Sequence, residues 1–245
     1  MISRIAQISI ILITLVVSGC FEPPEFPDNP IIGFKSLRYI TNLENGDSLL
    51  LTFDIEDGDG DIGLGDQEFN YPYHAYDLII DSRDTLVRYS NDIVPPLYTV
   101  DPSGRVELFS ETDSRINFDC SAYVTTEKDT FFISPNEYRF NLFIDFQRKV
   151  QGQYSPIDFE EELGVENCGV GFFDARIPIF DKENIGRSLS GEISYSLSPV
   201  SQFAGYEIIF RRDTFKMVFY IYDRALHKSN VVESPDLTFP GITED

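Results

Sequence analysis

Residues 48–63 read SLLLTFDIEDGDGDIG, an alternating apolar run that leads directly into a loop of aspartate and glycine. Every second position of the run is apolar, namely Leu49, Leu51, Phe53 and Ile55, and most of the positions between them are polar. Successive side chains of a strand point to opposite faces of a sheet. The pattern therefore predicts a β-strand with one buried face and one solvated face.

The same period of two recurs along the chain. It is clearest in EYRFNLFIDFQ at 137–147 and in TFKMVFYIYD at 214–223. Further strand candidates are 33–41, 76–81, 85–90, 115–125, 130–133, 174–180, 190–197 and 206–212. Glycine-containing turns separate the candidates, as half-buried antiparallel sheets require. We expect an all-β protein, an immunoglobulin-like antiparallel β-sandwich.

Residues 31–245 are expected to form one elaborated sandwich domain. The stretch from about 85 to 170 has the character of a long mid-chain insertion, and a division into two domains near residue 150 is the alternative. One short helix is predicted in SPIDFEEELG, with Ser155 as the N-cap, Pro156 at the first helical position and Gly164 as the stop.

The N-terminus predicts secretion and lipid attachment. Arg4 precedes the apolar run ISIILITLVV at 8–17, which is too short to span a bilayer but suits a signal peptide. The run ends in Val-Ser-Gly-Cys, which resembles a bacterial lipobox. We therefore expect residues 1–19 to be removed and Cys20 to be acylated, so that the lipid chains hold the protein at a membrane.

Residues 20–30 hold four prolines and predict an extended tether between the lipid and the folded body. Phe21 follows the cysteine where an inner-membrane lipoprotein commonly has aspartate, so the outer membrane is favoured. The sequence does not decide between the periplasmic face and the cell surface.

The charge of the chain limits its partners. It has 41 acidic and 19 basic residues and a formal net charge of −22. Such a surface repels the phosphate backbone, so we do not expect nucleic-acid binding. An envelope protein is the expected partner, together with the membrane that holds the lipid anchor.

Two cysteines remain if Cys20 is acylated. Cys120 and Cys168 would then face an oxidising compartment, where an even pair of cysteines predicts a disulfide. Two buried free thiols are the alternative, since the sequence does not show their geometry.

The acidic loop is the strongest candidate site. Asp57, Asp59 and Asp61 occupy alternate positions with glycine between them, and glycine allows backbone turns that let side chains converge. Carboxylate and carbonyl oxygens are the ligands that Ca²⁺ takes. Glu68 stands at the twelfth place counted from Asp57, as in an EF-hand, but Ile62 replaces the required glycine. Calcium binding and a solvated acidic turn both remain open.

The sandwich fold adds a fourth candidate ligand. The loop after the second strand and the loop of the final hairpin lie at the same end of an immunoglobulin-type sandwich. Asp223 closes the strand at 214–223 and is therefore expected near Asp57, Asp59 and Asp61. Arg224 beside it supplies the competing interpretation, in which a guanidinium neutralises the acidic loop without a metal.

Two segments carry a resemblance to a known group. GDSLLLTFDIEDGDGDIGL at 46–64 and YDRALHKSN at 222–230 resemble a group of uncharacterised Bacteroidota outer-membrane lipoproteins with an immunoglobulin-like fold. The resemblance implies the fold and the compartment only, because the group has no established activity to carry over. His227 stands where bacterial immunoglobulin-like modules often have asparagine.

The sequence does not predict an enzyme. It has two histidines without zinc-ligand spacing, no Gly-x-Ser-x-Gly elbow and no glycine-rich phosphate loop. We expect a structural or partner-binding outer-membrane lipoprotein with a calcium loop. Surface glycan binding is the alternative, since thirteen tyrosines offer stacking surfaces although tryptophan is absent. A hydrolase built on paired carboxylates is the third class.

Overall fold

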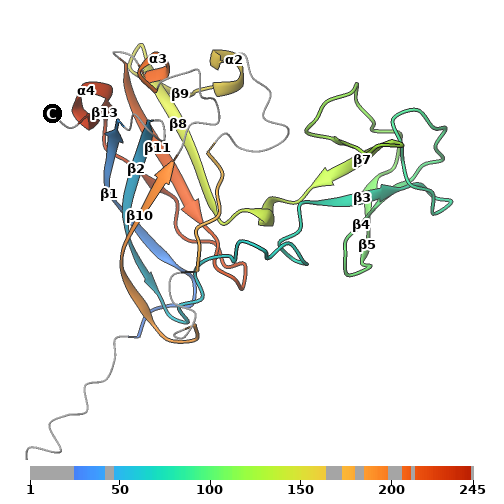
Figure 1. Ribbon diagram of the computed structural model, residues 1–245, viewed down its shortest axis with the longest axis horizontal. Helices are drawn as coiled ribbons and strands as arrows, with labels where there is room; N and C mark the ends of the chain where they lie inside the picture. The colour runs from blue at the N-terminus through green and yellow to red at the C-terminus, as the bar shows by residue number, and fades with distance from the viewer. Residues whose placement is uncertain are drawn as a thin grey trace, which may run out of the picture.

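Two antiparallel sheets packed face to face form the body of the protein, and a third sheet stands beside them (Figure 1). The computed structural model describes residues 25–41, 47–163, 173–179, 185–197, 206–210 and 213–243. Within these residues the chain is predominantly β-strand, which confirms the predicted all-β class.

The first sheet has the order β1-β2-β10, from β1 (Ile31–Ile40), β2 (Ser48–Asp57) and β10 (Leu189–Leu197). The second has the order β12-β11-β8-β9, from β8 (Leu142–Val150), β9 (Gln153–Pro156), β11 (Thr214–Ile221) and β12 (Val232–Glu233), and β13 (Leu237–Thr238) also pairs with β11. The first two strands thus pair with the late strand β10, while β8, β9, β11, β12 and β13 form the facing sheet. This is the division of an immunoglobulin-type sandwich.

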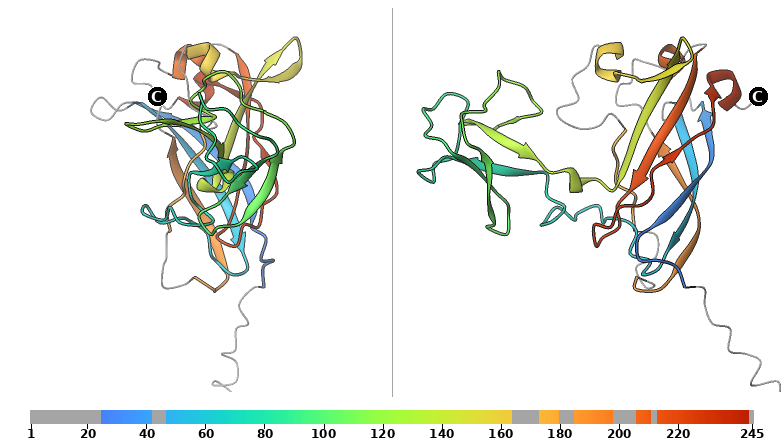
Figure 2. Two further views of the ribbon diagram at one scale, coloured as in Figure 1. Left: turned by 90° about the vertical axis from the view of Figure 1, so that its right-hand side faces the viewer. Right: turned by 180° about the vertical axis from the view of Figure 1, so that it is seen from behind.

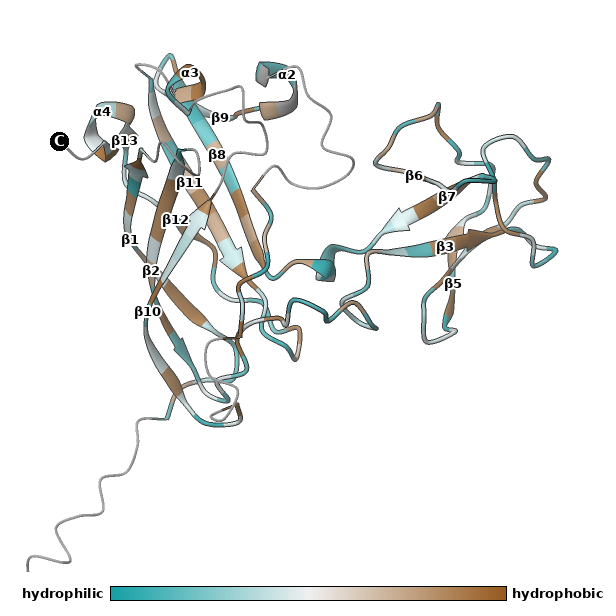
Figure 3. Ribbon diagram, in the orientation of Figure 1, coloured by the Kyte–Doolittle hydropathy of each residue, from teal (hydrophilic) through white to brown (hydrophobic). Residues whose placement is uncertain are grey.

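The core follows the alternation seen in the sequence. Leu49, Leu51, Phe53 and Ile55 of β2 are buried, and the alternate residues of β11 from Phe215 to Ile221 are buried opposite them. The Phe53 and Phe219 rings meet across the two sheets with centroids 5.6 Å apart. Burying each such side chain stabilises the fold by roughly 1.5–3 kcal/mol. Figure 3 shows the hydrophobic segments of these strands.

The mid-chain insertion is a separate small sheet, which we call the lobe and define as residues 76–135. Its order is β5-β4-β3-β7-β6, from β3 (Tyr76–Ile80), β4 (Leu97–Val100), β5 (Val106–Ser110), β6 (Tyr123–Thr125) and β7 (Thr130–Pro135). It has its own hydrophobic cluster of Ile79, Val87, Leu97, Tyr123 and Phe132. Figure 2 shows the lobe projecting from the sandwich.

The boundaries of the insertion differ from those expected. The chain leaves the sandwich after β2 and returns to it at β8, so the insertion precedes residue 142 and does not extend to 170. The alternative division near residue 150 would fall inside the hairpin that joins β8 to β9. The two ends of the lobe meet, since the Asn136 N–H donates to the Ala75 carbonyl at 3.1 Å.

The predicted helix begins later than its sequence pattern suggested. Ser155 and Pro156 end β9, because they pair with β8, and α2 spans Phe159–Leu163. Asp158, not Ser155, accepts the N–H of Glu161 with its side chain at 2.9 Å.

The structure has two further short helices that the sequence did not predict, and one of them lies where a strand was expected. α3 (Tyr206–Phe210) occupies the expected strand at 206–212, and α4 (Phe239–Ile242) is new. Tyr206, Ile209 and Phe210 are the buried residues of α3, a spacing of three and four that fits a helix face. A 3₁₀ turn, η1 (Glu137–Arg139), takes the start of the run at 137–147, so its strand begins only at Leu142.

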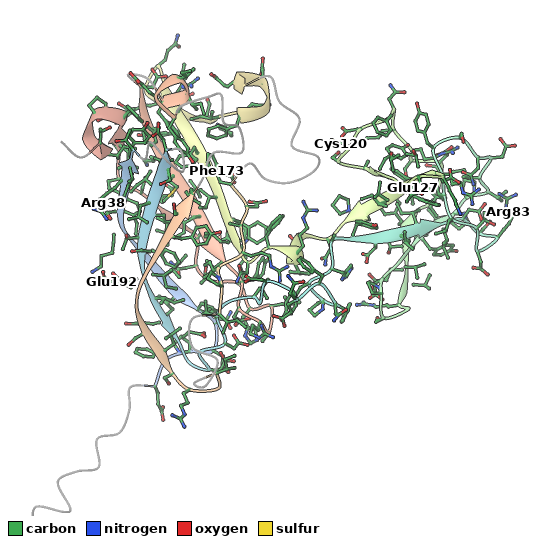
Figure 4. The ribbon with its side chains drawn as sticks, in the orientation of Figure 1. Arg38, Arg83, Cys120, Glu127, Phe173 and Glu192 are labelled. Atoms are coloured by element: carbon green, nitrogen blue, oxygen red, sulfur yellow. The ribbon has the colours of Figure 1, made fainter. Side chains whose placement is uncertain are left out.

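Several expectations fall outside the described residues. These are the signal peptide at 1–19, the acylated Cys20 and the cysteine partner Cys168. Cys120 lies on the lobe before β6 (Figure 4). Among the described residues, none of the helices has the length and apolar character needed to cross a membrane.

Candidate metal centre

Two buried aspartates lie at the ends of the inward-facing rows of the two sheets. Asp57 continues the buried series of β2 by one more alternate position, and its exposed fraction is 0%. Asp223 continues the buried series of β11 in the same way and is 1% exposed. Strand periodicity therefore forces both carboxylates into the interior at the same end of the sandwich.

The acidic loop brings two more carboxylates to Asp57. One carboxylate oxygen from each of Asp57, Asp59 and Asp61 lies within 4.8 Å of the other two. The Asp61 N–H also donates to Oδ2 of Asp57 at 3.1 Å. Gly60 makes this turn with φ +59°, and a Cβ there would lie 2.1 Å from the Arg187 carbonyl oxygen. Glycine is thus required at this position by both torsion and space.

Asp223 joins this group through the loop that follows β11. The backbone N–H of Arg224 donates to Oδ1 of Asp61 at 3.2 Å. Asp223 itself accepts from the His227 N–H at 2.7 Å, and its Oδ2 lies 2.9 Å from Nδ1 of the His227 ring. The structure therefore brings Asp57, Asp59 and Asp61 into one group and places Asp223 beside it, close enough for its charge to act on Asp57 and Asp61. We call these four residues the four-aspartate cluster.

The electrostatics of the four-aspartate cluster are unfavourable for a protein without a cation. Burial, followed by the charges of the other three aspartates, raises the pKa of Asp57 to about 7. Burial and the charges of Asp223 and Asp59 raise the pKa of Asp61 to about 6. Burial also raises the pKa of Asp223, although His227 opposes the rise. The Asp223 carboxylate in turn raises the pKa of His227.

Asp81 in the lobe shows what a satisfied buried aspartate looks like in the same chain. It is also 0% exposed, yet it accepts from three backbone N–H groups and is paired with Arg83. Burial alone would raise the pKa of Asp81, but these partners lower it to about 2. Oδ1 of Asp57 and Oδ1 of Asp59, by contrast, are buried and have no hydrogen-bond partner among the described residues.

The competing interpretation required the Arg224 guanidinium to neutralise the aspartates, but this side chain is paired elsewhere. Its guanidinium makes a two-pronged ion pair with the Glu68 carboxylate, and Nη1 also donates to the Gly63 carbonyl at 3.2 Å. The hydrogen bond with Arg224 lowers the pKa of Glu68. The Glu68 carboxylate therefore binds Arg224 and is not the calcium ligand that its EF-hand spacing suggested.

The cluster lies where three parts of the chain meet. The Gly58 N–H donates to the Pro27 carbonyl at 2.9 Å, which fastens the end of the tether to the acidic loop. The Tyr73 hydroxyl donates to the Arg224 carbonyl at 2.5 Å, which fastens the connection to the lobe against the last hairpin. Tether, sandwich and lobe thus share one anchoring region.

The donor set fits a hard cation. Three carboxylates converge within 4.8 Å, and the charge of Asp223 acts on them from the neighbouring loop. Two buried oxygens, Oδ1 of Asp57 and Oδ1 of Asp59, have no hydrogen-bond partner among the described residues. Ca²⁺ takes six to eight oxygen ligands, including carboxylates and carbonyls, whereas Mg²⁺ usually keeps several waters and one or two carboxylates. A cation here would offset the mutual repulsion that raises the carboxylate pKa values.

One feature of this region was not predicted from the sequence. The Arg224–Glu68 pair joins residues far apart in the chain, and Arg176 adds hydrogen bonds to the Gly65 and Glu68 carbonyls at 3.0 and 2.8 Å. Only the excess of acids near Arg224 could have suggested such a pair.

Comparison of the chain with protein-family models, curated proteins and solved structures finds no match in any of the three.

Proposed function

We propose that this protein is a lipid-anchored module of the outer membrane that presents the lobe to an envelope protein partner. A calcium ion held by Asp57, Asp59, Asp61 and Asp223 fixes the base from which the lobe projects. The observation that carries the proposal is the apolar outer face of the lobe sheet.

That face is defined by cross-strand partners. Leu78 pairs with Val100, which pairs with Val106, and Ile80 pairs with Tyr98, which pairs with Leu108. Direct partners point to the same side of a sheet, so the six side chains form one surface, the outer apolar face. Ile79, between two of them in sequence, points the other way into the core of the lobe.

The outer apolar face is open to solvent in the described structure. Val106 and Leu108 are more than half exposed, and Leu78 is also exposed. Clustered exposed apolar side chains on a soluble body commonly mark a protein-binding surface. The lobe carries many of the exposed large apolar residues, namely Leu78, Tyr89, Val94, Val106, Leu108, Phe109, Ile116 and Phe118.

Calcium supports this function by fixing the root of the lobe. The connection to the lobe starts at the acidic loop and is held by the Arg224–Glu68 pair and by Tyr73. A cation that offsets the repulsion among the aspartates stabilises this start. Rigid presentation lowers the ordering cost of binding a partner.

The anchor and the compartment rest on the sequence. The lipobox at Cys20, the proline-rich tether and Phe21 support an outer-membrane lipoprotein, and the resemblance to Bacteroidota lipoproteins agrees with that. The end of the tether lies against the acidic loop, so the sandwich would stand on its tether at the calcium end.

The test is crosslinking of the tagged protein in cells, followed by capture and identification of the bound proteins. Val106→Asp places a charge on the outer apolar face, and Val231→Asp is its matched control on the sandwich, with exposed fractions of 53% and 55%. We expect wild type and Val231→Asp to capture the same partner and Val106→Asp to capture at least tenfold less. Equal capture by all three proteins would show that the outer apolar face does not bind the partner.

Glycan binding is the second candidate, and one observation favours it. A cavity at the root of the lobe combines tyrosine rings with hydrogen-bonding side chains. It lies apart from the outer apolar face, so the two functions can be tested separately.

A further inference from the structure

We propose that the cavity at the root of the lobe binds a single neutral pyranose ring, which gives the glycan-binding alternative a definite site and chemical class. The cavity has a volume of about 150 Å³. Its walls come from the first connection to the lobe, from β4 and β5, and from the return connection. Leu226, in the loop after β11, closes it from the side of the sandwich.

Tyr71 supplies a flat apolar surface at this cavity. Its ring stacks on the imidazole of His74, with centroids 6.0 Å apart and planes 17° from parallel. Tyr71 is nevertheless 50% exposed, since the stack covers only one face of the ring. The other face can receive the C–H face of a sugar ring, which is the apolar side of a pyranose.

The surface is held in place before any ligand arrives. His74 is buried, and its Nε2 lies 2.7 Å from Oδ1 of Asp77. Nδ2 of Asn136 lies 3.3 Å from the other ring nitrogen and donates to the Pro72 and His74 carbonyls at 2.6 and 2.8 Å. Because the Asp77 carboxylate can only accept, Nε2 of His74 carries the proton of this hydrogen bond. A preorganised surface loses little entropy on binding.

Hydrogen-bonding groups also line the cavity. Asp101 accepts from the Ser103 N–H, the Ser103 hydroxyl and the Arg105 N–H, and all three bonds go to Oδ1. Its Oδ2 is therefore placed to accept from a ligand hydroxyl. The Arg105 guanidinium is paired with the Glu107 carboxylate and offers donors beside it. Planar donors and acceptors that converge in this way suit a ring bearing several hydroxyls.

Charge and size narrow the ligand further. Asp77, Asp101 and Glu107 contribute three carboxylates to the walls, against the single guanidinium of Arg105. This balance disfavours uronic acids and sulfated sugars, because they carry the same sign of charge. The volume is below the 300–1,000 Å³ typical of drug-sized ligands, so it accommodates one ring.

The test is saturation-transfer NMR on the full chain, purified in a detergent without a sugar headgroup. The probes are the methyl glycosides of glucose, galactose and mannose, with sodium glucuronate as the acidic counterpart and cadaverine as a cationic one. We expect transfer to the ring protons of at least one neutral glycoside, and weaker or absent transfer to glucuronate and cadaverine.

Three variants identify the site. Tyr71→Ala should weaken binding about tenfold, which corresponds to about 1.4 kcal/mol, whereas Tyr71→Phe keeps the stack and should bind as wild type. Tyr89→Ala is the matched control, an equally exposed lobe tyrosine at 49% that does not line the cavity, and should also bind as wild type. Binding unaffected by Tyr71→Ala, preference for glucuronate or cadaverine, or no transfer to any neutral glycoside would each overturn the proposal. None of these results bears on partner capture through Val106.

Discussion

Replacing Asp57 by asparagine is predicted to stabilise the metal-free protein at pH 8 and to abolish its stabilisation by calcium. The two effects have opposite signs because the same carboxylate is a source of repulsion without the ion and a ligand with it. Asparagine keeps an oxygen that can accept the Asp61 N–H, so the loop retains its hydrogen bond.

The magnitude follows from the raised pKa of Asp57. A rise from 3.8 to about 7 corresponds to a free energy of the order of 4 kcal/mol. Because the folded state binds the proton more tightly than the unfolded state, this stability is present in full below about pH 4 and is lost as the pH rises to about 7. The metal-free wild type should therefore lose roughly this amount or more between pH 4 and pH 8, because the raised pKa values of Asp61 and Asp223 act in the same direction. Asp57→Asn should lose less.

Calcium should restore a large part of the loss at high pH. Extracellular calcium modules bind with dissociation constants on the order of 10⁻⁴–10⁻³ M. A hundredfold excess over the dissociation constant stabilises the folded state by ~2.7 kcal/mol. For a domain of this size that raises Tm by roughly 5–10 °C.

The assay is thermal and urea unfolding of metal-stripped protein from pH 4 to pH 8, with and without calcium chloride at about 10 mM, which is about ten to a hundred times the expected dissociation constant. Asp66→Asn is the matched control, since Asp66 is an exposed acid of the same loop outside the four-aspartate cluster. The control should behave as wild type. A wild type without a calcium response, or an Asp57→Asn variant that is less stable than the metal-free wild type at pH 8, would contradict this prediction.

Three further predictions concern other parts of the chain. Metabolic labelling with a palmitate analogue should mark the wild type, and Cys20→Ala should lose the label; a label that survives would exclude acylation there. Non-reducing mass mapping should find the peptides of Cys120 and Cys168 joined, whereas free thiols at both positions in periplasmic material would contradict the disulfide. Arg224→Leu should increase hydrogen exchange in residues 63–75 by at least tenfold, because it removes the ion pair that joins Glu68 to the loop after β11; unchanged exchange would show that the pair does not hold this connection.

The period-two pattern was sufficient to predict the sandwich and its inward rows. Leu49 to Ile55 and Phe215 to Ile221 alternate without interruption, and one face of each strand is buried as expected. The same rule, extended by two residues, places Asp57 and Asp223 inside. The meeting of the acidic loop with Asp223 also follows from the fold, because both loops leave the same end of the sandwich.

Tertiary contacts determined the secondary structure of two segments whose sequence pattern predicted another one. Ser155 and Pro156 have the pattern of a helix start but complete a hairpin with β8, because pairing with an adjacent strand outweighs a local capping preference. Residues 206–210 have apolar residues at both strand and helix spacing, and packing against the sandwich core favours the helix.

A mid-chain insertion was predicted, but the limits of the lobe and the ion pair at its root could not be predicted from the sequence, for a similar reason. The strands of the lobe are short, so their alternation is weak, and its limits depend on where Ala75 meets Asn136. The partner of Arg224 depends on which of several nearby acids the folded connection to the lobe brings next to it. In the structure this acid is Glu68.

The most direct test of a calcium centre at this position is a crystal structure of the protein grown with calcium chloride, with the ion identified by its anomalous signal. We expect one ion bound by oxygens of Asp57, Asp59, Asp61 and Asp223, with metal–oxygen distances of ~2.3–2.6 Å. Carboxylates that pair with one another through shared protons, with no anomalous peak between them, would show that the site does not bind calcium.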